Sequence, residues 1–245
     1  MAEQTSISWA DATFNPWIGC TKVSPACDHC YAARDNERRK WVDGWGAGVP
    51  RRRTKTWGAP KQWDRKAQQT GYRPRVFCAS LADVFDNEVP TEWRTDLWQL
   101  IRETPNLRWM LVTKRIGNVA RMAPADWPFA HVGLISTIVT QAEWDRDWPK
   151  LARTPSPWRG VSAEPLLGHI DMDLSAGKPD WIITGGESGA GHRETDPAWV
   201  RSMRDQCRAN DIAFHHKQWG GIRPKANGCL IDGVEHKHFP EALAA

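Results

Sequence analysis

Short apolar segments recur along the chain, separated by polar stretches with a helical pattern. Each segment is five or six residues long, mostly apolar, and ends in small or polar residues. Continuous apolar runs of this length are typical of strands that are buried on both faces of a sheet. The segments lie at residues 14–19, 75–79, 108–113, 131–136, 159–163, 180–185 and 212–216.

Four helices are predicted between these segments, at residues 31–41, 91–103, 141–152 and 196–209. In the last of them, Asp196 is placed to cap the helix and Pro197 stands at the first helical position. Strands that alternate with helices form a parallel sheet with right-handed crossovers. About six such units predict an α/β fold, namely a partial (βα)6 barrel of the TIM type.

A single barrel domain accounts for the length of the chain, so we expect residues 1–245 to form one domain. Residues 42–74 form the longest stretch without a clear period and are predicted to be an insertion within it. Basic residues attract phosphates and indoles stack on bases, so this insertion is a candidate DNA contact. The alternative is that its tryptophans pack onto the barrel. The insertion contains the run Arg51-Arg52-Arg53-Thr54-Lys55, which sits among the tryptophans Trp41, Trp45, Trp57 and Trp63.

The net charge of +4 is unevenly distributed, because thirteen Lys and Arg stand against four Asp and Glu between Arg34 and Arg75. This asymmetry indicates a polyanionic partner, although a solvated basic face has the same count. The chain start has no secretory pattern, and no apolar run reaches the ~18 residues of a membrane span. We therefore expect a cytoplasmic protein that does not contact a membrane. There, a close group of cysteines indicates metal binding or catalysis rather than disulfides.

The most specific pattern in the sequence is the spacing C-x6-C-x2-C of Cys20, Cys27 and Cys30. Three thiolates can bind three irons of a [4Fe-4S] cluster and leave the fourth iron open. The amino and carboxylate groups of S-adenosylmethionine (SAM) can chelate such an open iron. Two alternatives stay open. The cysteines could bind zinc together with His29, although His29 is adjacent to Cys30 and zinc ligands usually come as separated pairs. They could also be structural cysteines without a metal.

The cysteine loop resembles the cluster loop of radical SAM enzymes, whose common spacing is C-x3-C-x2-C. In those enzymes the residue before the last cysteine is usually aromatic and packs near the adenine. His29 occupies that place here, followed after Cys30 by Tyr31. The longer first gap is similar to that of a phage-associated family of three-cysteine proteins, known mainly as a numbered phage gene product and as a domain of unknown function.

This second resemblance extends over nearly the whole chain and has several implications. It implies a partial (βα)6 barrel with the cluster on the loop after the first strand, and both a [4Fe-4S] cluster and SAM as cofactors. It also implies an external electron donor and a 5′-deoxyadenosyl radical that acts on the substrate. The implied process is DNA hypermodification in a phage-infected or prophage-carrying bacterium, and isomerisation of an amino-acid-decorated thymine is the specific reaction expected. The segments that carry the resemblance are 17–32, 76–85, 111–115, 162–168, 185–189 and 217–220.

Polar residues at the strand ends are the remaining site candidates, because barrel enzymes gather their chemistry at the carboxyl ends of the strands. Hydroxyls and a carboxylate suit the ribose diol of SAM, and a lysine suits its carboxylate. Glu164 has an alternative role, in which it pairs with Lys114 or Arg115 only to satisfy charge. The predicted cofactor contacts are His29, Tyr31, Ser80, Lys114, Ser136, Glu164 and Gly186, and the predicted catalytic residues are Glu187 and Lys217.

Three functions are compatible with the sequence: a radical SAM enzyme, a zinc-stabilised nucleic-acid-binding module, and a redox sensor that uses its cluster as a switch. Metal analysis after anaerobic purification separates them. We expect a brown protein with about four irons and broad absorption near 400 nm. A colourless protein with one zinc would support the binding module. Iron without SAM turnover would support the sensor.

Overall fold

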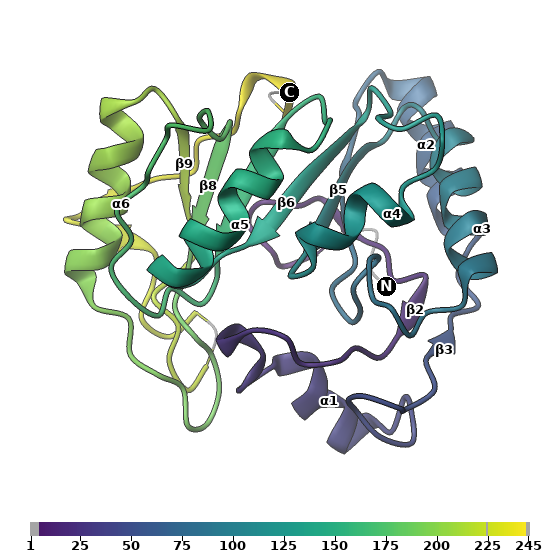
Figure 1. Cartoon of the computed structure of the whole chain (residues 1–245), viewed down its shortest axis with the longest axis horizontal. Helices are drawn as coiled ribbons and strands as arrows, with labels where there is room; N and C mark the ends of the chain where they lie inside the picture. The colour runs from purple at the N-terminus through teal and green to yellow at the C-terminus, as the bar shows by residue number, and fades with distance from the viewer. Residues whose placement is uncertain (1–4, 224, 244–245) are drawn as a thin grey trace.

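Seven parallel strands form one curled sheet in the computed structural model, which describes residues 5–223 and 225–243 (Figure 1). Each strand pairs with the next strand of the sheet along the chain, which leaves β1 and β9 at the two edges. The sheet is curled as a half-barrel. The α/β class and the partial barrel are therefore confirmed. The strands are β1 (Ala12–Thr13), β4 (Arg75–Cys78), β5 (Arg108–Thr113), β6 (Val132–Thr137), β7 (Arg159–Ala163), β8 (Trp181–Thr184) and β9 (Ala213–His216).

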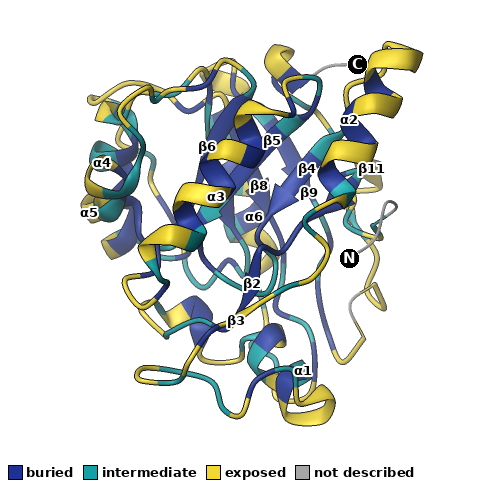
Figure 2. Ribbon diagram, turned by 90° about the vertical axis from the view of Figure 1, so that its right-hand side faces the viewer, coloured by how far each residue is buried: buried dark blue, intermediate teal, exposed yellow. Residues whose placement is uncertain are grey.

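Helices cover the outer face of the sheet, and their buried sides form the outer core with the strands. Trp109 and Leu134 of the sheet belong to this core, as do Leu97, Trp144 and Met203 of the helices. Figure 2 shows the buried strands behind helices whose outer sides are exposed. The helices of this layer are α2 (Ala59–Thr70), α3 (Thr91–Arg102), α4 (Val119–Met122), α5 (Gln141–Arg153) and α6 (Pro197–Ala209). Helix α1 (Tyr31–Arg39) lies below the sheet in the view of Figure 1, and the short 3-10 helices are η1 (Pro25–Cys27), η2 (Ile116–Asn118) and η3 (Glu241–Leu243).

The four predicted helices are confirmed to within two residues at their ends. Asp196 caps α6 as predicted, because its carboxylate accepts a hydrogen bond of 2.8 Å from the backbone N–H of Ala198. Pro197 is the first residue of that helix. Helix α1 ends earlier than predicted, since Lys40 adopts a left-handed conformation with φ of 50° and terminates the helical hydrogen bonding.

A second core fills the concave side of the sheet. Successive strand residues point to opposite faces, so Met110 and Ile135 belong to this inner core while their neighbours face the helices. Trp158 and Trp181, at the starts of β7 and β8, close the barrel at the amino ends of the strands. Trp9, from the segment before β1, packs into the same cluster. The carboxyl ends of the strands therefore remain as the open end of the half-barrel.

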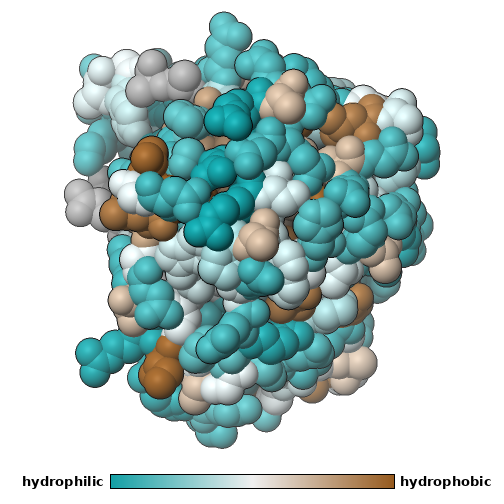
Figure 3. All heavy atoms as spheres, turned by 90° about the vertical axis from the view of Figure 1, so that its left-hand side faces the viewer, coloured by the Kyte–Doolittle hydropathy of each residue, from teal (hydrophilic) through white to brown (hydrophobic). Residues whose placement is uncertain are grey.

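The outer surface of α6 is polar and carries a small hairpin. Met203 and Cys207 are buried, whereas Arg201 and Arg204 each donate to the carboxylate of Asp232 at 2.8 Å. Asp232 lies in the turn between β10 (Leu230–Ile231) and β11 (Val234–Glu235). Figure 3 shows that this side of the molecule is mainly hydrophilic, with apolar residues scattered singly. Within the part of the chain that the structure describes, no helix is long and apolar enough to cross a bilayer.

The prediction of a first strand at residues 14–19 was wrong. The sheet strand lies earlier, at Ala12–Thr13, and the N–H of Phe14 continues its pairing with a 3.0 Å bond to the carbonyl of Phe77. The next pairing is an isolated parallel bridge at Gly19, whose N–H donates to the carbonyl of Leu81 at 3.1 Å. Pro16 has no N–H to donate, so the ladder cannot continue through it. The chain turns away as β2 (Trp17–Ile18), which pairs antiparallel with β3 (Arg52–Arg53).

The segment 42–74, which was predicted as an insertion without a clear period, contains α2 in its second half. Trp63 and Ala67 of α2 join the outer core, and the ring of Trp57 packs edge-on against Phe14 with centroids 5.8 Å apart. These tryptophans are therefore packing residues and not free stacking platforms. The sequence pattern of α2 is weak because Trp63 is its one large apolar side chain. The expected single domain of residues 1–245 extends beyond the described residues at both ends.

Gly133 of β6 provides a test of the inner core. An added Cβ would lie 1.9 Å from Cε2 of Trp158. Because overfilling a packed core costs about 1–3 kcal/mol, we expect Gly133→Ala to lower the free energy of unfolding by about that amount in urea denaturation. Gly168→Ala is the control, since a Cβ there meets no atom within 4 Å. A Gly133→Ala protein as stable as the wild type would contradict this packing.

Candidate functional site

A cavity of about 580 Å³ lies at the carboxyl ends of the strands and receives the cysteine loop. Pockets for small molecules and cofactors commonly have this size and lie at this end of a barrel. Its walls contain every predicted site residue except Ser136. The predicted residues that line it are Cys20, His29, Cys27, Cys30, Tyr31, Ser80, Lys114, Glu164, Gly186, Glu187 and Lys217.

The three cysteines occupy one irregular loop between β2 and α1. All three are free thiols; Cys27 ends the short helix η1, and Cys30 stands at the N-cap position of α1. The side chain of Ser24 orders the loop by accepting from the N–H of Ala26 at 3.1 Å. Helix starts direct N–H groups toward an anion, which suits a negatively charged cluster.

The donor set of this loop fits a cubane cluster. Cys20, Cys27 and Cys30 all face one cavity. Among the described residues, no three His, Cys, Asp or Glu side chains are placed to bind one metal ion. A cubane binds each thiolate at a separate corner iron, so its three ligands need not approach a common point.

Two buried arginines support the start of the loop. Arg115 donates to the carbonyl of Thr21 at 2.6 Å, and Arg51 donates to the hydroxyl of the same residue at 2.6 Å. Asp83 pairs with Arg115 at 3.0 Å, and Asp86 pairs with Arg51 at 2.8 Å. The side chain of Arg51 is 1% exposed, so this member of the basic run is a structural residue and not a phosphate contact.

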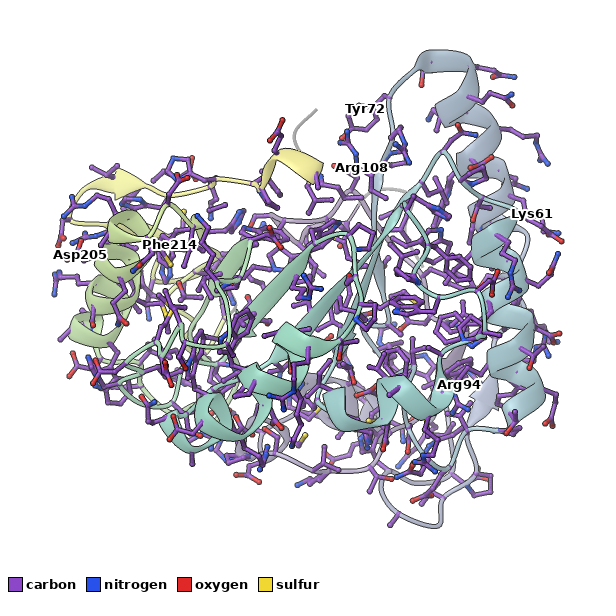
Figure 4. The ribbon with its side chains drawn as sticks, turned by 45° about the horizontal axis from the view of Figure 1, so that its top comes forward. Lys61, Tyr72, Arg94, Arg108, Asp205 and Phe214 are labelled. Atoms are coloured by element: carbon purple, nitrogen blue, oxygen red, sulfur yellow. The ribbon has the colours of Figure 1, made fainter. Side chains whose placement is uncertain are left out.

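Helix α3 anchors the segment that carries these carboxylates. Arg94, on the first turn of α3 (Figure 4), donates to the carbonyls of Val84 and Asp86 at 2.9 and 2.8 Å. The network therefore extends from the outer helix layer to the first cysteine. Cys20 lies at its end, where burial raises the pKa of the thiol to about 12 and the guanidinium of Arg115 acts in the opposite direction.

A second ionic group fixes the other half of the cysteine loop. Glu187, whose side chain is 5% exposed, accepts from Nδ1 of His29 at 2.8 Å and from Nη2 of Arg193 at 2.5 Å. Arg193 also donates to the carbonyl of Pro25 at 3.0 Å and lies 3.4 Å from the carboxylate of Asp28. The loop after β8 is thereby tied to the loop that carries Cys27 and Cys30.

These contacts determine the ionisation of Glu187. Although burial opposes ionisation, the hydrogen bonds from Arg193 and His29 lower the pKa of Glu187 to about 2. The carboxylate is therefore a permanently charged anchor in this arrangement. His29, predicted as a neighbour of the adenine, has one ring nitrogen engaged by this anchor.

Glu164 pairs with Lys217, so the predicted alternative partners Lys114 and Arg115 were wrong. The ammonium of Lys217 lies 3.2 Å from one carboxylate oxygen of Glu164, and the other oxygen accepts from Trp9 at 3.2 Å. A Cβ at Gly185 would lie 2.9 Å from Glu164 Oε1, so glycine leaves room for the carboxylate.

Lys114 and Ser80 differ in whether their side chains are already held by hydrogen bonds within the protein. Within the described residues, the ammonium of Lys114 has no hydrogen-bond or ion-pair partner, and it lines the cavity. The hydroxyl of Ser80 accepts from Asn15 at 2.9 Å, and its carbonyl accepts from the hydroxyl of Tyr31 at 2.5 Å. Lys114 is therefore available to an anionic ligand, whereas Ser80 is fixed in place.

Ser136 does not reach the cavity, which corrects its predicted placement. It is 1% exposed and faces the helix layer, and its hydroxyl has no hydrogen-bond partner among the described residues. The next residue, Thr137, lines the cavity instead. Successive side chains of a strand point to opposite faces of the sheet. A prediction that is wrong by one residue at a strand end therefore assigns a side chain to the wrong face.

Sequence reasoning missed several residues of this site. Asp83 carries no sequence signal for its buried role. A Lys-Arg dipeptide gives no sign of which member turns inward, so Arg115 was predicted only as a possible partner of Glu164. Arg193 lies in a loop without a pattern, and Asn15 lies in the segment predicted as the first strand, so the sequence carries no signal for their contacts. Cys78 and Cys207 are buried and do not line the cavity.

The anchor at Glu187 predicts a pH-dependent contribution to stability. Glu187→Gln removes the charge that faces Arg193 and His29, and hydrogen bonds to charged groups contribute about 1.5–3 kcal/mol. We expect a loss of about this size at pH 7. Because the folded pKa of about 2 lies below the ordinary 4.5, the contribution is present above 4.5 and disappears as the pH falls toward 2.

Urea unfolding of both proteins across this pH range measures the effect. The difference between wild type and Glu187→Gln should narrow as the medium becomes acidic. Glu194→Gln, at an exposed position of the same loop, is the control and should stay within about 0.5 kcal/mol of the wild type. A Glu187→Gln difference that is constant with pH would contradict the assignment.

Comparison with known proteins gives a family and a distant likeness in fold. No curated protein matches the chain by sequence. Two structures of spore photoproduct lyase are similar, a cysteine-to-serine mutant and a double mutant with bound AdoMet and dinucleoside spore photoproduct. Each has 15% identity and a TM-score of 0.48; they cover 81% and 80% of this chain, which spans 62% and 60% of their lengths. The family described as protein of unknown function DUF5131 matches residues 4–240, and the chain therefore belongs to it.

Proposed function

We propose that the protein is a radical SAM enzyme that binds a [4Fe-4S] cluster through Cys20, Cys27 and Cys30 and binds SAM in the adjoining cavity. The observation that carries the proposal is the position of three free cysteines on one loop at the open end of a parallel half-barrel. When bound and reduced by an external donor, the cluster together with SAM supplies a 5′-deoxyadenosyl radical that abstracts hydrogen from a substrate.

The protein's own residues would bind and orient SAM. Lys114 has the free ammonium that a carboxylate ligand requires. Ser80 and Tyr31 are held together beside the cysteine loop, where they define one wall of the cavity. Glu164 offers carboxylate oxygens to a diol or an ammonium. Thr137 takes the place on the strand β6 that was predicted for Ser136.

The predicted catalytic residues receive different proposed roles. Lys217 is oriented by Glu164 at 3.2 Å and lines the cavity, so we propose that it binds the substrate and holds a proton at Nζ. Glu187 is fully engaged by Arg193 and His29. We therefore propose that it positions the cysteine loop. Gly186 must be glycine because a Cβ there would lie 1.9 Å from the carbonyl oxygen of Trp219.

The proposed substrate is linked to nucleic acid, with isomerisation of an amino-acid-decorated thymine in phage DNA as the specific reaction. Exposed cations at the cavity wall support a polyanionic partner, namely Lys22, Arg34 and Lys225. Trp45, which belongs to the segment 42–74, also lines the cavity and is partly exposed, so its indole is available to stack on a base. A base would enter from a single strand or after flipping, since a duplex shields it.

Detection of 5′-deoxyadenosine tests the proposed function. Reduced protein with SAM and modified DNA should form it, whereas Cys27→Ala should form less than about one hundredth as much, because it lacks one cluster ligand. Cys229→Ala is the matched control, since Cys229 contacts Glu235 outside the cavity, and it should retain wild-type formation. Absence of 5′-deoxyadenosine with an assembled cluster would contradict the proposal.

A further inference from the structure

Arg115 reaches the first cysteine from the body of the sheet. It lies two residues after the end of β5, its side chain is 6% exposed, and its Nη1 lies 3.4 Å from the sulfur of Cys20. This is the distance of a hydrogen bond between a guanidinium N–H and sulfur. Among the described residues, no other hydrogen-bond donor contacts a sulfur atom of the three cysteines.

The guanidinium is held on two further sides, so its orientation is fixed. Nη1 also donates to Asp83 at 3.0 Å, and Nη2 donates to the carbonyl of Thr21 at 2.6 Å. Asp83 is itself oriented by the hydroxyl of Thr113 at 2.8 Å and by the N–H of Lys114 at 3.0 Å. A planar guanidinium clamped in this way keeps its remaining N–H directed at the sulfur.

We propose that Arg115 is a positioning residue that donates a hydrogen bond to the cluster-ligating sulfur of Cys20 and thereby raises the reduction potential of the cluster. This inference rests on the proposed cluster. Hydrogen bonds to cluster sulfurs stabilise the added electron of the reduced state. Because Asp83 balances the charge of Arg115, the effect comes from the local N–H dipole and not from a net positive charge.

Arg51 provides a matched comparison within the same network. It is also buried, with a side chain that is 1% exposed, and it supports the same loop through the hydroxyl of Thr21. Its other hydrogen bonds go to Asp86 and to the carbonyls of Gly46 and Val49. No contact of Arg51 with a cysteine sulfur is present among the described residues. A change at Arg51 therefore disturbs the loop without removing the bond to sulfur.

Redox titration followed by EPR, on wild type, Arg115→Lys and Arg51→Lys, tests the proposal. Both variants keep the buried positive charge, but only Arg115→Lys loses the clamped N–H to sulfur. We expect Arg115→Lys to shift the reduction equilibrium about tenfold toward the oxidised cluster, or about 59 mV for one electron. Arg51→Lys should shift it less than twofold. An unshifted Arg115→Lys, or an equal shift in Arg51→Lys, would overturn the inference.

A measurement on the wild type covers the case in which Arg115→Lys does not retain iron. Protein labelled with ¹⁵N-arginine should show, by pulsed EPR of the reduced cluster, a coupled exchangeable proton and nitrogen from one arginine. If a wild-type protein with a full cluster shows no coupling to arginine, Arg115 does not donate a hydrogen bond to the sulfur of Cys20. A wild type that assembles no cluster would instead refute the proposed function, so the two failures are distinguishable.

Discussion

Parallel pairing of all seven strands is the constraint on which the rest of the structure depends. Strands that run in one direction place their carboxyl ends at one edge, and each following loop begins there. The tryptophan-rich inner core closes the opposite end. The concave side therefore has one open end, and the cysteine loop, the Glu164–Lys217 pair and Lys114 are all brought to it.

Ionic contacts, more than apolar packing, hold the cysteine loop against that open end. On one side the pairs Arg51–Asp86 and Arg115–Asp83 bind the backbone and hydroxyl of Thr21. Burial of such pairs is costly in desolvation, and removal of one partner leaves an unpaired buried charge. Both pairs meet at Thr21, the residue after Cys20, so the network fixes the loop beside its first cysteine.

On the other side, Glu187 joins the loop after β8 to the segment between Cys27 and Cys30. Arg193 is central, because it contacts Glu187, Asp28 and the carbonyl of Pro25. The two ends of the cysteine loop are thus fixed by different parts of the sheet, one after β4 and β5 and the other after β8. The loop bridges the half-barrel and does not extend from a single strand.

Hydrophobic periodicity by itself determined the fold class and the four predicted helices, and the spacing of Cys20, Cys27 and Cys30 identified the cysteine loop. These features are local, since a buried strand or an amphipathic helix is specified by its own residues. Tertiary structure decided the rest. Strand parity turned Ser136 away from the cavity and Thr137 toward it, and Pro16 ended the first strand early. The partners of Glu164, Glu187 and Arg115 come from loops far apart in sequence, and no local pattern records which charges meet when the sheet curls.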